Sequence, residues 1–337
     1  AEPGAVRTNA GDPYQVFGPF ERKWRAREKP APVAEPDEIA AAERSPLPTL
    51  DALGFDEPGA EVPDGGQSVA RERLEAFCAG PIYAYAAERD YPARDATSRL
   101  SPHLKFGTVG IRTVWAATEA ALAAATGDDE RESVEAYQSQ LAWRDFYAHV
   151  LSFNPETVVE NYVEYERPIE WRNDPDELAA WKAGETGFPI VDAGMRQLLD
   201  EAWMHNRVRM IVASFLTKDL LVDWRHGYRH FREHLVDHDT ANDVGGWQWA
   251  ASTGTDAQPY FRIFNPTTQG ERYDPDAAYV REHVPELRCV DPETIHAWPE
   301  LDEAERAAAA PDYPAPVVDH AERRETTLEA FRTARGE

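Results

Sequence analysis

The chain has few cysteines and no long apolar run. Only two cysteines, Cys78 and Cys289, occur among its 337 residues, which excludes a framework of disulfides. No stretch of about 18 apolar residues is present, which argues against a membrane span. The first residues, AEPGAVRTNAGD, lack the basic and apolar segments of a secretion signal. We therefore expect a soluble protein of the reducing cytoplasm with no membrane partner.

Positive charge is scarce as well. The sequence contains 61 acidic and 35 basic residues, which give a formal net charge of −26. Long-range attraction to nucleic acid is therefore expected to be weak at low salt, and solubility to be high. Such acidity is typical of halophilic proteins, which are adapted to concentrated salt.

Alternating strand patterns are almost absent, whereas helical patterns are frequent. From residue 68 onward, apolar residues recur at helical spacing, for example Val191, Met195 and Leu198. We therefore predict an all-α fold, with one helical domain at residues 68–299. The remaining segments are expected to be an N-terminal piece at 1–30, an acidic linker rich in Pro and Ala at 31–67, and an acidic, loosely packed C-terminal tail at 300–337.

The segment 97–102, TSRLSP, favours a helix start. Ser101 is a suitable N-cap, and Pro102 suits the first helical position. Free backbone amides at this point, with two further hydroxyls and the guanidinium of Arg99, would form a cradle for phosphate. A simple helix cap without a ligand remains the alternative.

The segment 203–264 is unusually dense in tryptophan, arginine and polar amides, which favours an aromatic cofactor and a polyanionic partner. Its first part, 203–232, holds six Lys or Arg against two Asp. We interpret it as a nucleic-acid surface with Trp143 and Trp249 as platforms for stacked bases. A solvated helix face is the alternative.

Four histidines, at positions 226, 230, 234 and 238, recur every four residues. Such spacing would place imidazoles along one helix face, where a pair of them could bind a metal. No Cys pair and no HExxH motif accompanies them. We therefore expect an exposed histidine stripe and no metal site.

Several motifs resemble the photolyase and cryptochrome family, and within it most closely the class I cyclobutane pyrimidine dimer photolyases. The motifs, which run in order from about residue 85 to 287, are TSRLSPHL, QLAWRDFY, FPIVDAGMRQL, WMHNRVRM, SFLTKDLLVDW and GGWQWAASTGTDAQPYFRIFNPTTQGE. The resemblance implies a helical domain that holds FAD beneath a cavity for a flipped-out dimer. In this family an α/β antenna domain normally precedes the helical one. VRTNAGDPYQVF is similar to the end of that domain, so residues 1–30 are expected to be its remnant and the start of the linker.

The resemblance also implies roles for individual residues. Flavin binding is expected of Tyr85, Thr97, Ser98, Arg99, Leu100, Ser101, Tyr137, Arg144, Arg209, Asp237, Asp239 and Asp243. Contacts with the dimer are expected of Gln140, Trp143, Asn206, Arg207, Met210 and Trp249. Electron transfer from the surface to the flavin is expected to pass through Trp171, Trp224 and Trp247.

Two of these positions depart from the family pattern. Gln140 replaces the usual Glu at a dimer contact, and Asp243 replaces the Asn that typical repair enzymes have near the flavin N5 atom. Plant cryptochromes are similar to this chain at the second position. We expect Asp243 to act as a catalytic proton donor to the flavin, because a carboxylic acid transfers a proton more readily than an amide.

The implied function is light-driven DNA repair by a monomeric carbon-carbon lyase. Blue light would excite reduced FAD, which passes an electron to a cyclobutane pyrimidine dimer in DNA and recovers it after the ring opens. The alternatives are a cryptochrome-like photoreceptor that uses the same FAD and tryptophans, and a helical protein without FAD.

Overall fold

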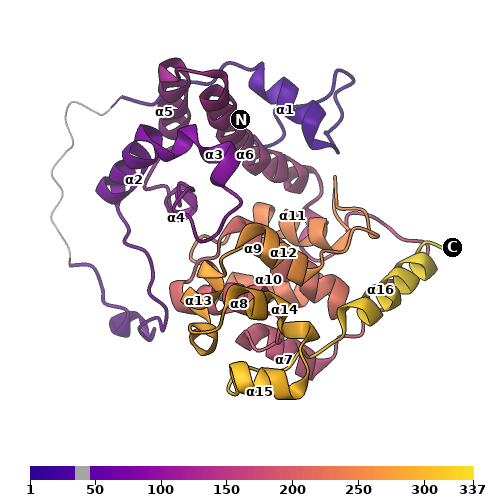
Figure 1. Cartoon of the computed structure of the whole chain (residues 1–337). Coiled ribbons are helices and arrows are strands. Elements are labelled where there is room, and N and C mark those ends of the chain that lie inside the picture. The colour runs from indigo at the N-terminus through magenta and orange to yellow at the C-terminus, as the bar shows by residue number, and fades with distance from the viewer. Residues whose placement is uncertain (35–45) are drawn as a thin grey trace.

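The computed structural model describes residues 1–34 and 46–337, so residues 35–45 of the predicted linker lie outside the described part. Figure 1 shows a helical molecule, and no strand occurs in the described ranges. This confirms the all-α prediction. The helices are α1 (Phe17–Arg25), α2 (Gln67–Ala79), α3 (Tyr85–Glu88), α4 (Ser101–Phe106), α5 (Ile111–Ala124), α6 (Asp128–Phe153), α7 (Pro175–Ala183), α8 (Pro189–Glu201), α9 (Asn206–Ser214), α10 (Trp224–His234), α11 (Thr240–Ala251), α12 (Pro266–Tyr273), α13 (Ala278–His283), α14 (Pro292–Ala297), α15 (Glu303–Ala309) and α16 (His320–Ala334).

Acidic residues and asparagine start most of the later helices. The side chains of Asp223, Asp239 and Asn265 each accept a hydrogen bond from a backbone N–H in the first turn of α10, α11 and α12. Asp302 and Asp319 do the same for α15 and α16. A negative charge at a helix N-terminus also interacts favourably with the helix dipole. Part of the large acidic excess therefore serves to cap helices.

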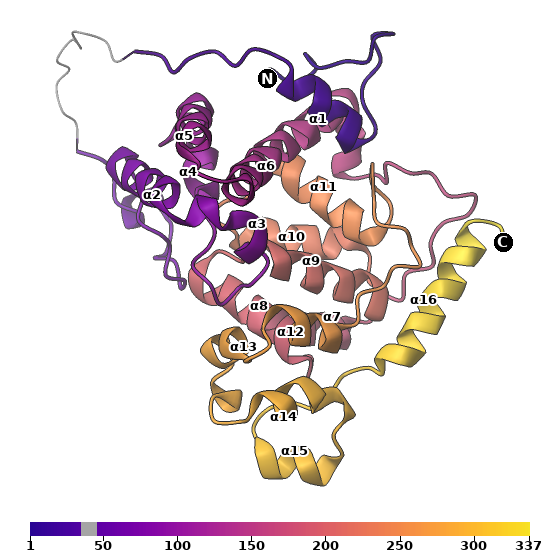
Figure 2. The same cartoon turned by 45° about the horizontal axis from the view of Figure 1, so that its top comes forward.

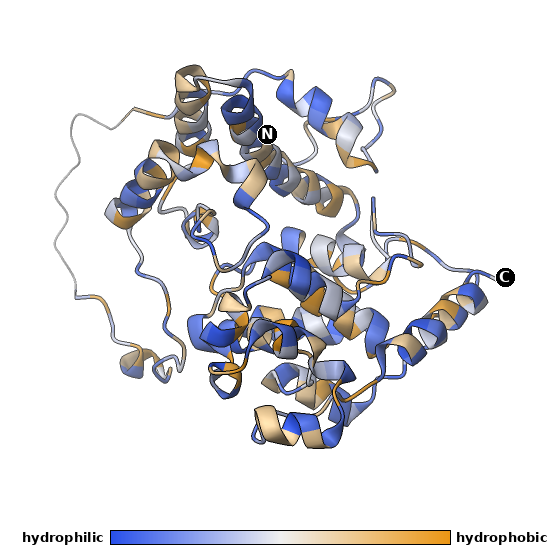
Figure 3. Cartoon of the chain, in the orientation of Figure 1, coloured by the Kyte–Doolittle hydropathy of each residue, from blue (hydrophilic) through white to orange (hydrophobic). Residues whose placement is uncertain are grey.

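Two large buried apolar cores and one small one, formed by Ile169, Leu221, Phe331 and Ala334, occur in the described part of the chain. One large core is formed by residues between 6 and 146, and the other by residues between 181 and 318. Figures 1 and 2 show α6 beside α11 in both views. Most helices carry both hydrophilic and hydrophobic residues, as Figure 3 shows and as amphipathic helices around a core require. None of the described helices has the length and apolar content needed to cross a bilayer.

The N-terminal piece packs on the helical body. Helix α1 lies along α6, and the rings of Phe20 and Phe146 are 5.3 Å apart. Trp24 donates its indole N–H to Asp145 Oδ2 at 2.7 Å. Val6 and Phe20 are buried. Residues 1–25 thus complete the first core.

The C-terminal segment 300–337 packs on the helical body, so the expectation of a loosely packed tail is wrong. Phe331 of α16 is fully buried, and its ring lies 3.8 Å from the Nζ atom of Lys218. Tyr313 is also buried and donates a hydrogen bond to Asp192 Oδ2 at 2.5 Å. The composition of this segment is acidic and rich in Ala, so a few apolar anchors carry its packing and the overall pattern conceals them.

Candidate functional site

A cavity of about 440 Å³ lies among α6, α9 and α11. Its size falls within the roughly 300 to 1,000 Å³ that is typical of cofactor and ligand sites. Five of the residues expected to bind flavin line it, and so do all six expected to contact a dimer. These residues are Tyr85, Thr97, Arg144, Arg209, Asp243, Gln140, Trp143, Asn206, Arg207, Met210 and Trp249.

Two consecutive glycines shape the α11 wall of this cavity. A Cβ atom on Gly245 would lie 2.1 Å from a ring carbon of Tyr147, so only glycine allows α11 to approach α6 this closely. A Cβ atom on Gly246 would meet nothing within 4 Å, and Gly246 lines the cavity. The bare backbone at Gly246 therefore leaves room for a bound molecule.

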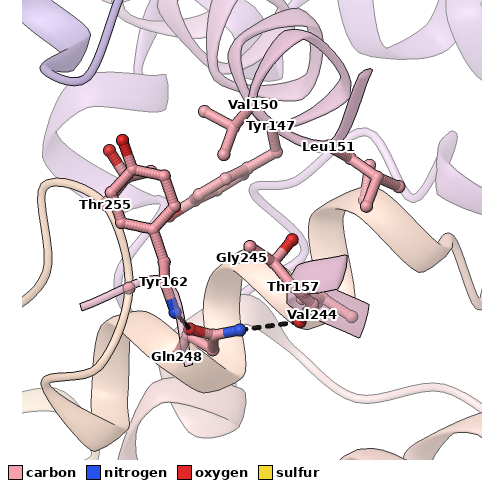
Figure 4. Close-up of a pocket in the computed structure, with 11 residues that line it drawn as sticks. Tyr147, Val150, Leu151, Thr157, Tyr162, Val244, Gly245, Gln248 and Thr255 are labelled. Atoms are coloured by element: carbon pink, nitrogen blue, oxygen red, sulfur yellow. Dashed lines mark hydrogen bonds between the residues drawn. The ribbon is translucent and has the colours of Figure 1, made fainter. Parts of the chain in front are cut away.

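Gln248 fixes α11 against the loop that follows α6, as Figure 4 shows. Its Oε1 atom accepts from the N–H of Tyr162 at 2.9 Å, and its Nε2 atom donates to the carbonyl oxygen of Thr157 at 2.8 Å. The neighbouring hollow, which Tyr147 and Val244 help to line, measures about 20 Å³. It has room for a water molecule and is too small for a cofactor. Gln248 is thus part of the rigid support behind the large cavity.

Asp243 has a partner that the sequence did not reveal. His238 Nδ1 lies 2.5 Å from Asp243 Oδ2, and the backbone N–H of Asp239 donates to the same oxygen at 3.0 Å. Burial would raise the pKa of Asp239, but hydrogen bonds from Asn242 and the charge of Arg144 lower it. Asp239 and Asp243 therefore place two carboxylates beside the cavity, and the cation of Arg144 lies near them.

Arg209 is held in place by Asp237. Its Nη2 atom donates to both carboxylate oxygens of Asp237 at 3.0 and 2.8 Å, and its Nε atom donates to the Met204 carbonyl at 2.8 Å. Arg144 lines the same cavity, and no hydrogen bond to another described residue involves its guanidinium. Arg144 is therefore the cation that is most available for an anionic ligand, whereas Arg209 is largely neutralised.

Arg207 is paired within the wall of the cavity. Its Nη2 atom lies 2.9 Å from Asp90 Oδ2, and its guanidinium carbon lies 4.3 Å from the centre of the Tyr273 ring. Both Arg207 and Asp90 line the cavity. The ion pair and the ring contact orient Arg207 before any ligand enters.

Trp143 is also fixed on one side. Its ring is stacked on Phe17, with centroids 3.7 Å apart and an angle of 9° between the planes. A second aromatic residue of the cavity, Trp249, packs against Phe264. An indole that is packed on one face and lines a cavity can stack against a nucleic-acid base.

The TSRLSP segment does not form the predicted cap. Helix α4 begins at Ser101, so Ser101 lies one position inside it, and its hydroxyl accepts from the indole N–H of Trp203 at 3.3 Å. Leu100 takes the N-cap position without a capping side chain and is buried. The helix start was misplaced by one residue because Leu100 adopts a helical φ and ψ there.

The other residues of this flavin-binding prediction are close to the cavity or behind it. Thr97 lines the cavity, whereas the hydroxyl of Ser98 accepts from Tyr137 at 3.0 Å. Arg99 lies over the ring of Trp203 at 4.4 Å and 3.6 Å from Glu201, so its side chain does not line the cavity. Tyr137 and Asp237 act as supports, since each holds a neighbour and neither lines the cavity.

The three tryptophans expected to carry electrons share one apolar core. Trp247 lines the cavity, Trp224 is fully buried, and Trp171 is partly buried against the same core. The ring of Trp247 also lies 6.0 Å from that of Trp181, which the sequence did not single out. Their roles in electron transfer stay a prediction.

The predicted basic surface at 203–232 is mostly neutralised or buried. Lys218 is buried, and burial lowers its pKa well below the usual value. Arg225 pairs with Asp223 at 2.9 Å, in addition to the pairs of Arg207 and Arg209 described above. Of the six cations, only Arg229 and Arg232 are exposed and form no ion pair with the described residues. The exposed surface of this segment therefore carries less unpaired positive charge than its count of Lys and Arg predicts.

Sequence reasoning missed several residues of the cavity wall. Asn242 directly precedes Asp243, so its place in the chain was a usable signal, and the glycine pair at 245 and 246 already indicated a close backbone approach to a ligand. Tyr147 ends the motif QLAWRDFY, so it also had a signal. Arg89, Asp90 and Phe231 had none, because their positions depend on how separate helices pack together.

Comparisons with known proteins show to which family the chain belongs. A family model described as the FAD binding domain of DNA photolyase matches residues 137–333. A protein of Halobacterium salinarum named deoxyribodipyrimidine photo-lyase is 64% identical over 342 residues, which cover 99% of this chain and 71% of that protein. The chain belongs to the DNA photolyase family.

Solved structures of this family are similar in fold. The crystal structure of a bacterial class III photolyase from Agrobacterium tumefaciens matches with a TM-score of 0.89 and 38% identity, over 100% of this chain and 72% of that chain. A cryptochrome from Synechocystis sp. matches with a TM-score of 0.85 and 26% identity, over 96% of this chain and 70% of that one. Both branches of the family thus share this helical architecture.

The cavity fits the FAD of this photolyase family in its chemistry. Aromatic walls at Tyr85 and Trp247 suit a flat ring system, and the unpaired guanidinium of Arg144 suits a diphosphate. Gly246 removes the side chain that would otherwise fill part of the space. FAD is therefore the cofactor of this domain, and the residues that would hold it are those of the cavity wall.

Proposed function

We propose that this protein is a deoxyribodipyrimidine photolyase, an enzyme that uses light to split cyclobutane pyrimidine dimers in DNA. The observation that carries the proposal is the shared cavity: five of the residues expected to hold FAD and all six expected to contact a dimer line it. A reactive cofactor and its substrate can therefore meet without a large movement of the domain. Bound FAD, reduced and excited by light, supplies the electron for the reaction.

The residues of the chain provide binding and orientation. Trp143, backed by Phe17, offers an aromatic face to an extruded base. The amide of Gln140 forms no hydrogen bond with the described residues, which leaves it free for the carbonyl and imide groups of a pyrimidine. Arg207, held by Asp90, stands ready for a polar or anionic group of the DNA.

The finer assignments are also proposals. Assignment to class I rests on the sequence motifs, and the similarity to a class III photolyase is the competing assignment. We propose the division of the chain at residues 30, 67 and 299, a monomer, and a cytoplasmic location with damaged DNA as the partner. A halophilic character is in keeping with the acidic composition and with the Halobacterium relative.

The deciding experiment is repair of a defined thymine dimer in an oligonucleotide by the purified, reduced protein. Light should restore the thymines and darkness should not. Substitution of Trp143 by Ala should weaken dimer binding, since stacking contributes about 1 to 3 kcal/mol per base. A protein that binds FAD and responds to light but leaves the dimer intact would instead be a cryptochrome-like photoreceptor. Asp243 supports that second candidate, because plant cryptochromes are similar to this chain at this position.

A further inference from the structure

A cluster of two histidines and one glutamate lies at the end of α10, outside the cavity. One ligand atom from each of His230, Glu233 and His234 lies within 4.8 Å of the others. The two imidazole rings are 4.3 Å apart. His230 is 5% exposed, so the expected stripe of exposed histidines is wrong at this position.

His234 has the arrangement of a metal-binding histidine. Its Nδ1 atom lies 2.9 Å from the carbonyl oxygen of His230. A carbonyl can only accept, so Nδ1 carries the proton and donates it, and the lone pair of Nε2 is left free. Metal-bound histidines typically donate their other ring N–H to a carbonyl in this way, which fixes both the tautomer and the ring.

His230 carries a buried polar atom without a partner. Its Nε2 atom is buried and forms no hydrogen bond within the described residues. An unpaired buried polar atom destabilises a fold, and such atoms occur where a ligand or ion completes the site.

We propose that His230, Glu233 and His234 bind a divalent transition metal of the zinc class. Two imidazoles and a carboxylate match the ligand types that Zn²⁺, Co²⁺ and Ni²⁺ accept, and three protein ligands leave a position for water. Helix α10 also contributes Trp224 and Phe231 to the core, so a metal here would clamp the last turn of a helix that supports Trp247.

The test is metal binding by the FAD-loaded protein without a polyhistidine tag, after treatment with a chelator. Calorimetry with Zn²⁺ alone should show one site per chain, and Zn²⁺ should raise the melting temperature. Co²⁺ should give visible absorption bands at wavelengths beyond those of the flavin. His234→Ala should weaken binding at least tenfold and abolish the thermal shift.

The control is His226→Ala, which removes a half-buried histidine of the same helix that lies outside the cluster. It should bind Zn²⁺ as the unchanged protein does. Glu233 is exposed, so Glu233→Gln tests the site even where a histidine variant fails to fold, and it should bind several times more weakly. The proposal is overturned if no saturable binding occurs, if both cluster variants bind as tightly as the unchanged protein, or if His226→Ala loses as much affinity as His234→Ala.

Discussion

His238 Nδ1 lies 2.5 Å from Asp243 Oδ2, at the start of the helix that forms one wall of the cavity. The pair joins the segment after α10 to the first turn of α11. It orients the carboxylate of Asp243, which lines the cavity together with Gly246 and Trp247. The contact therefore links the stability of the α10–α11 connection to the chemistry expected of Asp243.

We expect Asp243→Asn to slow light-driven reduction of bound FAD and to leave repair by chemically reduced protein largely intact. An amide can replace the carboxylate as a hydrogen-bond acceptor but is a poor proton donor. Time-resolved absorption and a repair assay on prereduced protein would measure the two effects. Loss of repair in the prereduced variant would show that Asp243 positions the cofactor or the substrate. A double-mutant cycle with His238→Gln should give a coupling of about 0.5 to 3 kcal/mol in the free energy of unfolding.

The two adjacent glycines should separate folding from ligand binding. Gly245→Ala forces a methyl group against Tyr147 and should lower the free energy of unfolding by about 1 to 3 kcal/mol. Without FAD, the Gly246→Ala variant should be at least as stable as the unchanged protein, and at most about 1 kcal/mol more stable, because alanine favours the helical conformation. Its methyl group enters the cavity, so FAD should bind more weakly. Denaturation and flavin titration of both variants would test these two predictions. Equal FAD affinity in Gly246→Ala and the unchanged protein would contradict the second one.

Stability should fall in acid because of His205. This residue caps α9 by accepting the N–H of Arg207 on Nδ1 at 3.2 Å, which requires the neutral ring. Burial lowers its pKa to about 4, whereas the unfolded value is about 6.5. A lowered histidine pKa stabilises the fold above pH 6.5, and this contribution is lost as the pH falls through 4. The full effect is about 3 kcal/mol. His205→Asn retains a capping side chain without titrating, so its unfolding free energy should vary less between pH 6.5 and 4.

Salt should discriminate between stacking and charge in DNA binding. In molar salt the Debye length is about 3 Å, so phosphate contacts contribute little. Trp249→Ala should then cost about 1 to 3 kcal/mol of dimer affinity, because stacking is not screened. Arg229→Ala, at an exposed and unpaired cation, should reduce affinity only at low salt. Fluorescence titration at both salt concentrations would measure this, and equal losses in molar salt would count against stacking.

Gln140 should tolerate a change of charge better than the loss of its polar group. Gln140→Glu retains a hydrogen-bond acceptor and should change the repair yield only modestly. Gln140→Leu should lower it clearly, because polar groups of the dimer would be buried without partners. Repair yields per absorbed photon on a defined dimer provide the comparison. A Leu variant as efficient as the unchanged protein would exclude the contact.

The sequence by itself determined the helical class and the kinds of residue at the site. Helical spacing at positions such as Val191 and Met195 depends only on neighbours along the chain, so the periodicity reports it directly. The motifs around Arg144, Asn206 and Asp243 likewise identified residues that line the cavity, because each motif keeps several wall residues within one or two helical turns.

Only the tertiary structure decided which charges and polar atoms meet. The pairs Arg207–Asp90 and Phe17–Trp143 join residues more than 100 positions apart, and such contacts depend on packing that no local pattern encodes. The same is true of the C-terminal segment, whose composition predicted a loose tail although Phe331 is buried over Lys218. Burial and partners arise when distant helices close over one another, and this is why Lys218 is a core residue rather than part of a basic surface.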